Sequence, residues 1–239
     1  RIPLLVPVNW EDGWPVLGID GKVAAKLDLP ANKSLSPGIV SSDDFERKAG
    51  EPALPLVWQW NHNPAVDLWS VTERSGFLRL RTGDLTDDFL SAKNTLTQRT
   101  IGPSCSAAIA VEVSNMKDGD FAGLSLLQKN YGLVGVRMEG NTKSLVMINA
   151  MTGAPQELAK IDLKQQRVFF KASCDFSNKK DTAQFFYSTD GHNWNRIGNV
   201  LKMSYTIPHF MGYRFGLFNY ASKAAGGYVD FDYFHLTSN

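Results

Sequence analysis

Apolar and polar side chains alternate at every second position over most of the chain after residue 43. Residues 167–176 show this most clearly, because their even-numbered positions carry Val, Phe, Ala, Cys and Phe. Successive side chains of a strand point to opposite faces, so a period of two predicts a half-buried β-strand. No stretch of about ten residues has the period of a helix. The chain must therefore build its core from strands.

Other segments with the same alternation are separated by short turns rich in Gly, Asp and Asn. The predicted strands also cover residues 77–81, 107–113, 121–128, 133–139, 144–150, 183–188, 213–220 and 228–236. Many short strands at this spacing are typical of a β-sandwich or a barrel. The sequence has no internal repeat, which argues against a propeller in this region. We therefore predict an all-β fold.

The beginning of the chain differs in composition from the rest. Residues 29–40 are rich in Pro, Ser, Asn and Gly, as linkers are. Residues 1–28 are too few to form a core alone, so we expect them to pack on something else. They contain no charged segment followed by an apolar one, which is the pattern of a signal peptide. We expect them to be an internal part of a longer polypeptide. We predict three parts: residues 1–28, a linker over 29–40, and a sandwich over 41–239.

The charges nearly cancel, with 25 Lys and Arg against 24 Asp and Glu. This balance argues against nucleic acid or an anionic membrane as the partner, because both select basic surfaces. No apolar run reaches the roughly 18 residues that a membrane span needs. The 6 Trp, 7 Tyr and 14 Phe, with many Asn and Gln, instead suit a neutral polyhydroxylated ligand. The alternative is that most of these rings form the core.

The sequence carries no familiar catalytic motif. Gly-x-Ser-x-Gly, His-Glu-x-x-His, Walker and Gly-x-Gly-x-x-Gly patterns are absent, and the 4 His are scattered. Cys105 and Cys174 stand in no Cys-x-x-Cys or Cys/His cluster, so we predict no thiolate metal site. The two cysteines form either one disulfide or a pair of buried free thiols.

Several aromatic and amide side chains are candidates for binding a ligand. The densest group follows Val57, where Trp, Asn, Gln and His crowd together. The candidate binding residues are Trp60, Asn61, Asn63, Trp69, Gln98, Arg99, Gln128, Tyr131 and Asn219. Amides near the ends of apolar strands need hydrogen-bond partners when buried. They are therefore either ligand contacts or members of a structural network.

Acidic residues open the first predicted strand of the sandwich and recur on its last. The first and last strands of a sandwich commonly pair, and carboxylate oxygens suit Ca²⁺. Asp44 and Asp230 are accordingly candidate ligands of a structural Ca²⁺. The alternative is a solvated sheet edge whose acids bond to neighbouring loops.

Several separate stretches resemble the C-terminal module of family 43 glycoside hydrolases, the bacterial β-xylosidases and α-L-arabinofuranosidases. They are residues 56–64, 69–80, 96–103, 119–128 and 229–234. The resemblance covers about residues 40–237 and implies a concanavalin A-like (jelly-roll) β-sandwich, grouped with xylan-binding modules. Residues 7–16 resemble the last stretch of the family's five-bladed catalytic propeller, which predicts residues 1–28 as its tail.

The resemblance also implies what the chain lacks and what it contacts. The family's catalytic Asp base, second Asp and Glu acid stand in propeller motifs that this sequence does not contain, so whether this chain acts as an enzyme is left open. The implied partners are xylan or xylo-oligosaccharide and a catalytic propeller, in the same protein or a separate chain. A sandwich loop of the family places a Phe at the edge of the active-site pocket, and Phe210 is the matching residue here. The substrate class implies a secreted or periplasmic location.

Three functions follow from these observations. The chain is a carbohydrate-binding accessory module of a xylan-degrading glycoside hydrolase, or a structural buttress of the propeller without a sugar site of its own. The third is a glycosidase using Asp230 and Asp232, which stand two residues apart on one predicted strand. We disfavour the third, because those residues match the family's terminal strand and because fold alone does not carry function.

Overall fold

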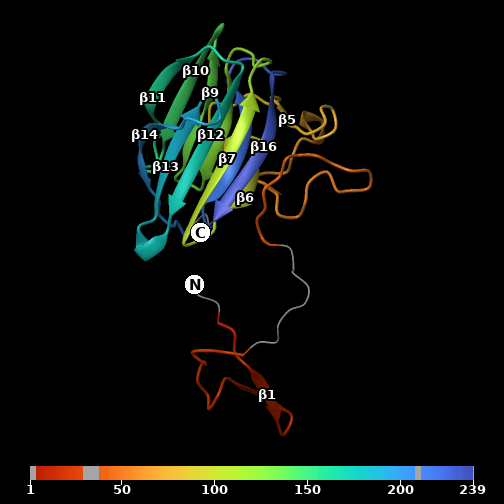
Figure 1. The fold of residues 1–239 in the computed structure, drawn as a ribbon, viewed down its shortest axis with the longest axis vertical. Helices are drawn as coiled ribbons and strands as arrows, with labels where there is room; N and C mark the ends of the chain where they lie inside the picture. The colour runs from red at the N-terminus through yellow and green to blue at the C-terminus, as the bar shows by residue number, and fades with distance from the viewer. Residues whose placement is uncertain (1–3, 29–37, 208–210, 239) are drawn as a thin grey trace. The chain divides into compact units, whose positions relative to one another are not determined.

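The computed structural model describes residues 4–28, 38–207 and 211–238 of the chain (Figure 1). The chain divides into two compact units, Arg1–Pro37 and Gly38–Asn239. The predicted linker of residues 29–40 lies outside the described residues except for its last three positions. The two units are considered separately below.

The first unit contains a short β-hairpin. Strands β1 (Val8–Glu11) and β2 (Trp14–Leu17) pair antiparallel, with Glu11 opposite Trp14. The connecting residues Asp12 and Gly13 both have positive φ angles, 50° and 82°, as a tight two-residue hairpin turn requires. The rings of Trp10 and Trp14 are 71% and 76% exposed. The hairpin itself therefore leaves its largest apolar side chains uncovered.

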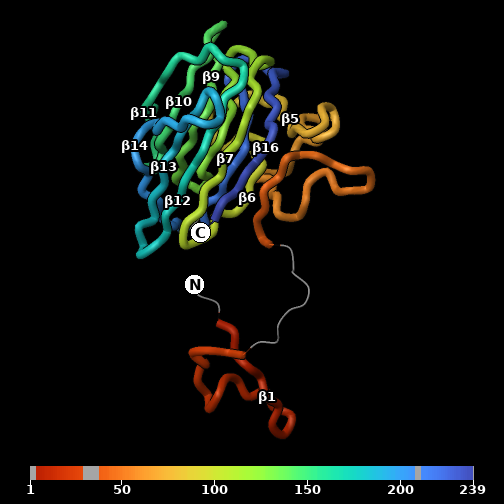
Figure 2. Tube along the Cα trace, in the orientation of Figure 1, coloured from red at the N-terminus to blue at the C-terminus, as the bar shows by residue number. Residues whose placement is uncertain are grey.

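The second unit is a sandwich of two seven-stranded antiparallel sheets (Figures 1 and 2). The first sheet has the order β11-β10-β9-β8-β15-β6-β3, and the second has the order β14-β13-β12-β7-β16-β5-β4. The strands of the first sheet are β3 (Gln59–Trp60), β6 (Leu96–Arg99), β8 (Asp120–Leu127), β9 (Gly132–Glu139), β10 (Thr142–Asn149), β11 (Gln156–Leu163) and β15 (Arg214–Ala221). Those of the second sheet are β4 (Trp69–Ser70), β5 (Leu78–Arg81), β7 (Ser104–Glu112), β12 (Arg167–Asp175), β13 (Thr182–Ser188), β14 (Asn195–Lys202) and β16 (Tyr228–Ser238). This architecture confirms the predicted all-β fold.

Helical structure in the described residues is limited to three single turns, Val66–Leu68, Phe89–Ser91 and Ser177–Lys179. No helix in this part of the chain is long and apolar enough to cross a membrane.

The core lies between the sheets and follows the period of two. On β12 the side chains alternate between buried and half-buried along the whole strand, with Phe170 fully buried. Phe185 on β13 and Phe215 on β15 enter the same core. Strands β11 and β14 were not predicted, because their side chains are mostly exposed and give no regular alternation.

A second apolar cluster covers part of the outer face of the first sheet. Phe121 on β8 and Phe218 on β15 belong to it, and Phe89 packs on them from the loop before β6. Phe218 can point outward because its neighbour Leu217 points into the core. Part of this outer face is therefore apolar, and the remainder is left for the polar pocket described below.

Asp43 joins the start of the sandwich to its last strand. Its backbone exchanges two hydrogen bonds with Phe234 on β16, at 2.9 and 2.8 Å. Its buried carboxylate accepts hydrogen bonds from Trp58 Nε1 at 2.7 Å and from Arg47 at 2.8 Å. The Trp58 ring then packs edge-on against Phe234. One ion pair thus fixes the N-terminal segment of the sandwich on the core.

The two cysteines face each other across neighbouring strands. Cys105 on β7 lies opposite Cys174 on β12, and both thiols are buried and free. The structure therefore contains the free-thiol form, one of the two alternatives that the sequence left open.

The buried carboxyl group of Asp120 predicts a pH-dependent stability. One of its oxygens accepts a hydrogen bond from the Lys117 backbone at 2.7 Å, and the other has no partner among the described residues. Burial raises the pKa of Asp120 to about 6, from an ordinary value of 3.8. The folded state therefore holds this proton more tightly than the unfolded chain does. Its contribution to stability is complete below a pH of about 4 and is lost as the pH rises through about 6.

Replacing Asp120 by Asn should remove this contribution. We would measure the free energy of unfolding of both proteins by urea titration at about pH 4 and pH 7. Between these two pH values, the wild type should lose roughly 2 kcal/mol more stability than Asp120→Asn does. The control variant is Asp67→Asn, which replaces an exposed acid in a single helical turn. Its free energy of unfolding should depend on pH in the same way as that of the wild type. Equal profiles for Asp120→Asn and the wild type would contradict the prediction.

Candidate functional site

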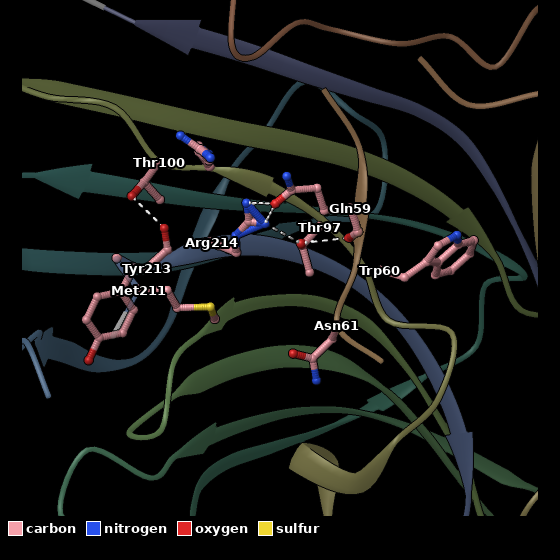
Figure 3. A pocket seen from close by; sticks show the side chains of 10 residues that line it. Gln59, Trp60, Asn61, Thr97, Thr100, Met211, Tyr213 and Arg214 are labelled. Atoms are coloured by element: carbon pink, nitrogen blue, oxygen red, sulfur yellow. Dashed lines mark hydrogen bonds between the residues drawn. The ribbon is translucent and has the colours of Figure 1, made fainter. Parts of the chain in front are cut away.

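A pocket of about 520 Å³ opens on the outer face of the first sheet, where β3, β6 and β15 run side by side (Figure 3). Its lining residues are Gln59, Trp60, Asn61, Thr97, Arg99, Thr100, Met211, Gly212, Tyr213 and Arg214. Two amides, two threonines and two arginines thus border one space, whereas the rings of Trp60 and Tyr213 pack toward the core. We call it the β3–β6–β15 pocket.

Strand parity places the polar side chains of this pocket. Leu96 on β6 and Phe215 on β15 are fully buried in the core. Their neighbours Thr97 and Arg214 must therefore point to the opposite, outer face. Gln59 on β3 pairs with Thr97, so its side chain lies on the same outer face.

Arg214 is the central side chain of the pocket. It is only 9% exposed, and it donates hydrogen bonds to Gln59 Oε1 and to Thr97 Oγ1, the latter at 3.2 Å. Thr97 Oγ1 in turn donates to the Gln59 carbonyl at 2.8 Å. Burial, with the positive charge of Arg99, lowers the pKa of Arg214 from its ordinary value. An arginine nevertheless remains charged at neutral pH, so the pocket carries a fixed, partly desolvated cation.

Three of the predicted binding residues line this pocket. Trp60 at the end of β3, Asn61 directly after it and Arg99 at the end of β6 all border the pocket, although they are far apart in sequence. Asn63 is exposed and is not part of the lining. Phe210 lies outside the described residues.

Gln98 and Gln128 are parts of a structural network. Gln98 points inward, the opposite way to its neighbour Arg99, and its amide bonds to the backbone N–H and carbonyl of Ser41 at 3.0 and 2.9 Å. The Gln128 amide accepts from Thr206 at 2.9 Å and donates to the Met211 carbonyl at 3.3 Å. Both side chains are fully buried. Of the two alternatives that the sequence allowed, the structure favours the network for these two amides.

The remaining candidates lie elsewhere in the sandwich. Tyr131 packs on Phe89 in the outer apolar cluster, and burial raises its pKa to about 12. Asn219 points inward and donates to the Leu80 carbonyl at 2.8 Å, at the edge of a separate pocket of about 210 Å³. Trp69 packs on Trp60 with ring centroids 5.2 Å apart. The predicted residues therefore do not form a single site.

The proposed calcium ligands are not brought together. Asp230 is buried and paired with Arg79 at 2.7 Å and Arg74 at 3.2 Å, so its charge is already neutralised. Asp44 is exposed and bonds to His235 at 2.7 Å. Among the described residues no group of three or more His, Cys, Asp and Glu side chains is arranged to hold a metal ion. In the described residues, basic side chains therefore already bond to both predicted Ca²⁺ ligands, Asp44 and Asp230.

Asp230 and Asp232 are also poor candidates for catalysis. A break in the pairing of β16 with β7 falls between Phe231 and Tyr233, so the two acids do not follow a regular strand. Asp230 is paired with Arg79, and Asp232 with Arg167. Neither carboxylate is free to act as a general acid or base without breaking an ion pair.

Gln59, Thr97 and Arg214 were not predicted as binding residues. For Arg214 a signal was present, since it is the only charged residue in β15, whose sequence is RFGLFNYA. A charge beside a buried apolar run indicates either an ion pair or a site. Gln59 stands in the dense aromatic and amide group after Val57, whereas the role of Thr97 depends on pairing between distant segments.

The sandwich and its neighbours in known proteins define the class of this chain. Residues 42–237 match the family described as the Beta xylosidase C-terminal Concanavalin A-like domain. The chain belongs to this family, which confirms the resemblance and the concanavalin A-like fold. A β-xylosidase of Formosa agariphila is 29% identical over 98% of this chain.

Two solved structures superimpose closely. A bifunctional GH43-CE protein of Bacteroides eggerthii is 61% identical over all of this chain, with a TM-score of 0.92. A GH43 glycoside hydrolase engineered to display endo-xylanase and exo-arabinofuranosidase activity is 29% identical over 98% of this chain, with a TM-score of 0.85. The chain spans 42% of the Formosa protein, 31% of the Bacteroides chain and 49% of the engineered enzyme. In all three, the matched region is part of a longer polypeptide.

Removing the Gln59 amide should test how far Arg214 depends on it. In Gln59→Ala the buried guanidinium loses its best acceptor, so we expect the free energy of unfolding to fall by about 1–3 kcal/mol. Asn63→Ala is the matched control, because that exposed amide makes no hydrogen bond to the described residues and should change stability by less than about 0.5 kcal/mol. Equal stability of the two variants in urea titration would show that Arg214 does not need Gln59.

Proposed function

We propose that the chain is an accessory module of a xylan-degrading glycoside hydrolase and that the β3–β6–β15 pocket binds a xylo-oligosaccharide. The observation that carries the proposal is the lining itself. The amides of Gln59 and Asn61 border the same space as the guanidinium groups of Arg99 and Arg214. Amides and guanidinium groups form hydrogen bonds with the hydroxyls of a sugar.

The comparisons support the substrate class. The Formosa relative is named a β-xylosidase, and the engineered enzyme has endo-xylanase and exo-arabinofuranosidase activity. A catalytic domain outside this sequence would supply the reaction on β-xylosides or α-L-arabinofuranosides. Because xylan is too large to enter a cell, we propose a secreted or periplasmic location.

The expected affinity is modest. Each hydrogen bond between an amide and a sugar hydroxyl contributes about 1 kcal/mol net. A few such contacts correspond to dissociation constants in the micromolar-to-millimolar range. Such weak binding would hold a chain end near a catalytic domain without trapping the product.

A second candidate function is docking on that catalytic domain, with or without a sugar site. The first unit exposes Trp10, Trp14 and several aliphatic side chains. Exposed tryptophans are typical anchors of protein interfaces. We propose that this unit packs on a catalytic propeller of the same protein or of a separate chain.

Xylohexaose titration of the 239-residue chain tests the sugar site. We expect binding with a micromolar-to-millimolar dissociation constant, and about a 3- to 10-fold loss in Asn61→Ala, because one amide contributes about 1 kcal/mol. Asn141→Ala, in the exposed turn between β9 and β10, should bind as the wild type does. No binding by calorimetry at millimolar sugar would leave docking as the function.

Truncating Trp14 tests the docking surface. In this chain, Trp14→Ala should change the free energy of unfolding by less than about 0.5 kcal/mol, because the ring is exposed. In the polypeptide that carries the propeller, the same change should destabilise the domain contact by about 2 kcal/mol, measured by thermal unfolding. An equally small effect in both polypeptides would contradict the docking proposal.

A further inference from the structure

Most arginines of the sandwich have a carboxylate partner, but three arginines in the described residues do not. Arg47, Arg74, Arg79, Arg81, Arg137 and Arg167 each form a salt bridge with Asp or Glu. The other arginines in the described residues are Arg99, Arg196 and Arg214, and no carboxylate pairs with them there. The residues outside the description contain no Asp or Glu.

Two of these three unpaired cations meet in one pocket. Arg196 is exposed and lies on β14, outside the pocket. Arg99 and Arg214 are directly opposite each other on β6 and β15, and both line the β3–β6–β15 pocket. Arg99 is exposed, so water screens part of its charge, but Arg214 is largely buried. Like charges placed opposite each other on a sheet repel, so an anion in the pocket would relieve the repulsion between the two arginines.

The pocket supplies no anion of its own. Its ten lining residues include amides, hydroxyls, rings and a thioether, but no Asp or Glu. The acceptors of Arg214 are neutral oxygens of Gln59 and Thr97. These hydrogen bonds orient the guanidinium without cancelling its charge. The arrangement differs from that of the half-buried Arg47, which is bonded to the Asp43 carboxylate.

We propose that the β3–β6–β15 pocket recognises the carboxylate of a uronic acid carried on a xylo-oligosaccharide, with Arg214 and Arg99 as the specificity-determining residues. The planar fork of a guanidinium matches a carboxylate in two parallel hydrogen bonds. The neighbouring amides of Gln59 and Asn61 suit the hydroxyls of the sugar that bears it. This inference rests on the proposed function, and it narrows the ligand from a neutral oligosaccharide to an acidic one.

Calorimetric titration of the 239-residue chain with two matched ligands tests the inference. One is a xylo-oligosaccharide that bears a single glucuronic acid, and the other is the same oligosaccharide without it. We expect the acidic ligand to bind at least 10-fold more tightly at low salt. The difference should shrink at about 1 M sodium chloride, because salt screens charge interactions. Equal affinity for both ligands would overturn the inference and leave the proposed sugar site intact, whereas no binding of either would overturn both.

Three substitutions locate the effect. Arg99→Gln removes an exposed cation at little risk to folding and should reduce the preference for the acidic ligand about 3- to 10-fold. Arg214→Lys keeps the charge but loses the fork, and it should reduce the preference further. Arg196→Gln is the matched control, because it removes an unpaired arginine outside the pocket and should leave the preference unchanged. If Arg99→Gln and Arg196→Gln behaved alike, the assignment of the two arginines would be wrong.

A competition experiment distinguishes a sugar carboxylate from a protein carboxylate. A short peptide rich in glutamate presents the same chemical group without a pyranose. It should displace the acidic oligosaccharide at least 10-fold less effectively than free glucuronic acid does at equal concentration. A peptide that competed as well as glucuronic acid would overturn the assignment to a sugar and indicate an acidic protein surface instead.

Discussion

The burial of alternate side chains between the two sheets is the constraint from which the rest of the sandwich follows. Phe215 and Leu96 must enter the core, because exposing them would forfeit about 2 kcal/mol each. Once they do, strand geometry sends Arg214 and Thr97 to the outer face. The polar pocket is thus a consequence of the core, and a shift of one residue in either strand would destroy both.

The charged groups of the sandwich are arranged in two ways. On the second sheet, Asp230 and Glu112 are surrounded by arginines, so buried and half-buried charges cancel locally. At the β3–β6–β15 pocket the Arg214 cation is held by neutral oxygens and has no carboxylate partner among the described residues. An ion pair stabilises a fold only when its partners are fixed, whereas an unpaired cation retains its affinity for an outside ligand. This contrast separates structural arginines from those available for recognition.

The two units of the chain differ in their cores. The sandwich has a complete core, while the hairpin of the first unit exposes its tryptophans. So short a segment is too small to build a stable core alone. Our proposals accordingly place chemistry in a separate catalytic domain and recognition of an acidic sugar in the sandwich.

The sequence by itself determined the all-β fold and the family, because alternation and short motifs are local signals. It did not reveal β11 and β14, whose exposed side chains lack that alternation. Nor could it show that Gln98 and Arg99, adjacent in sequence, serve the core and the pocket respectively. Only the tertiary structure decided that Arg79 and Arg74 neutralise Asp230 and that Arg214 meets Arg99, because these contacts join strands far apart in the chain.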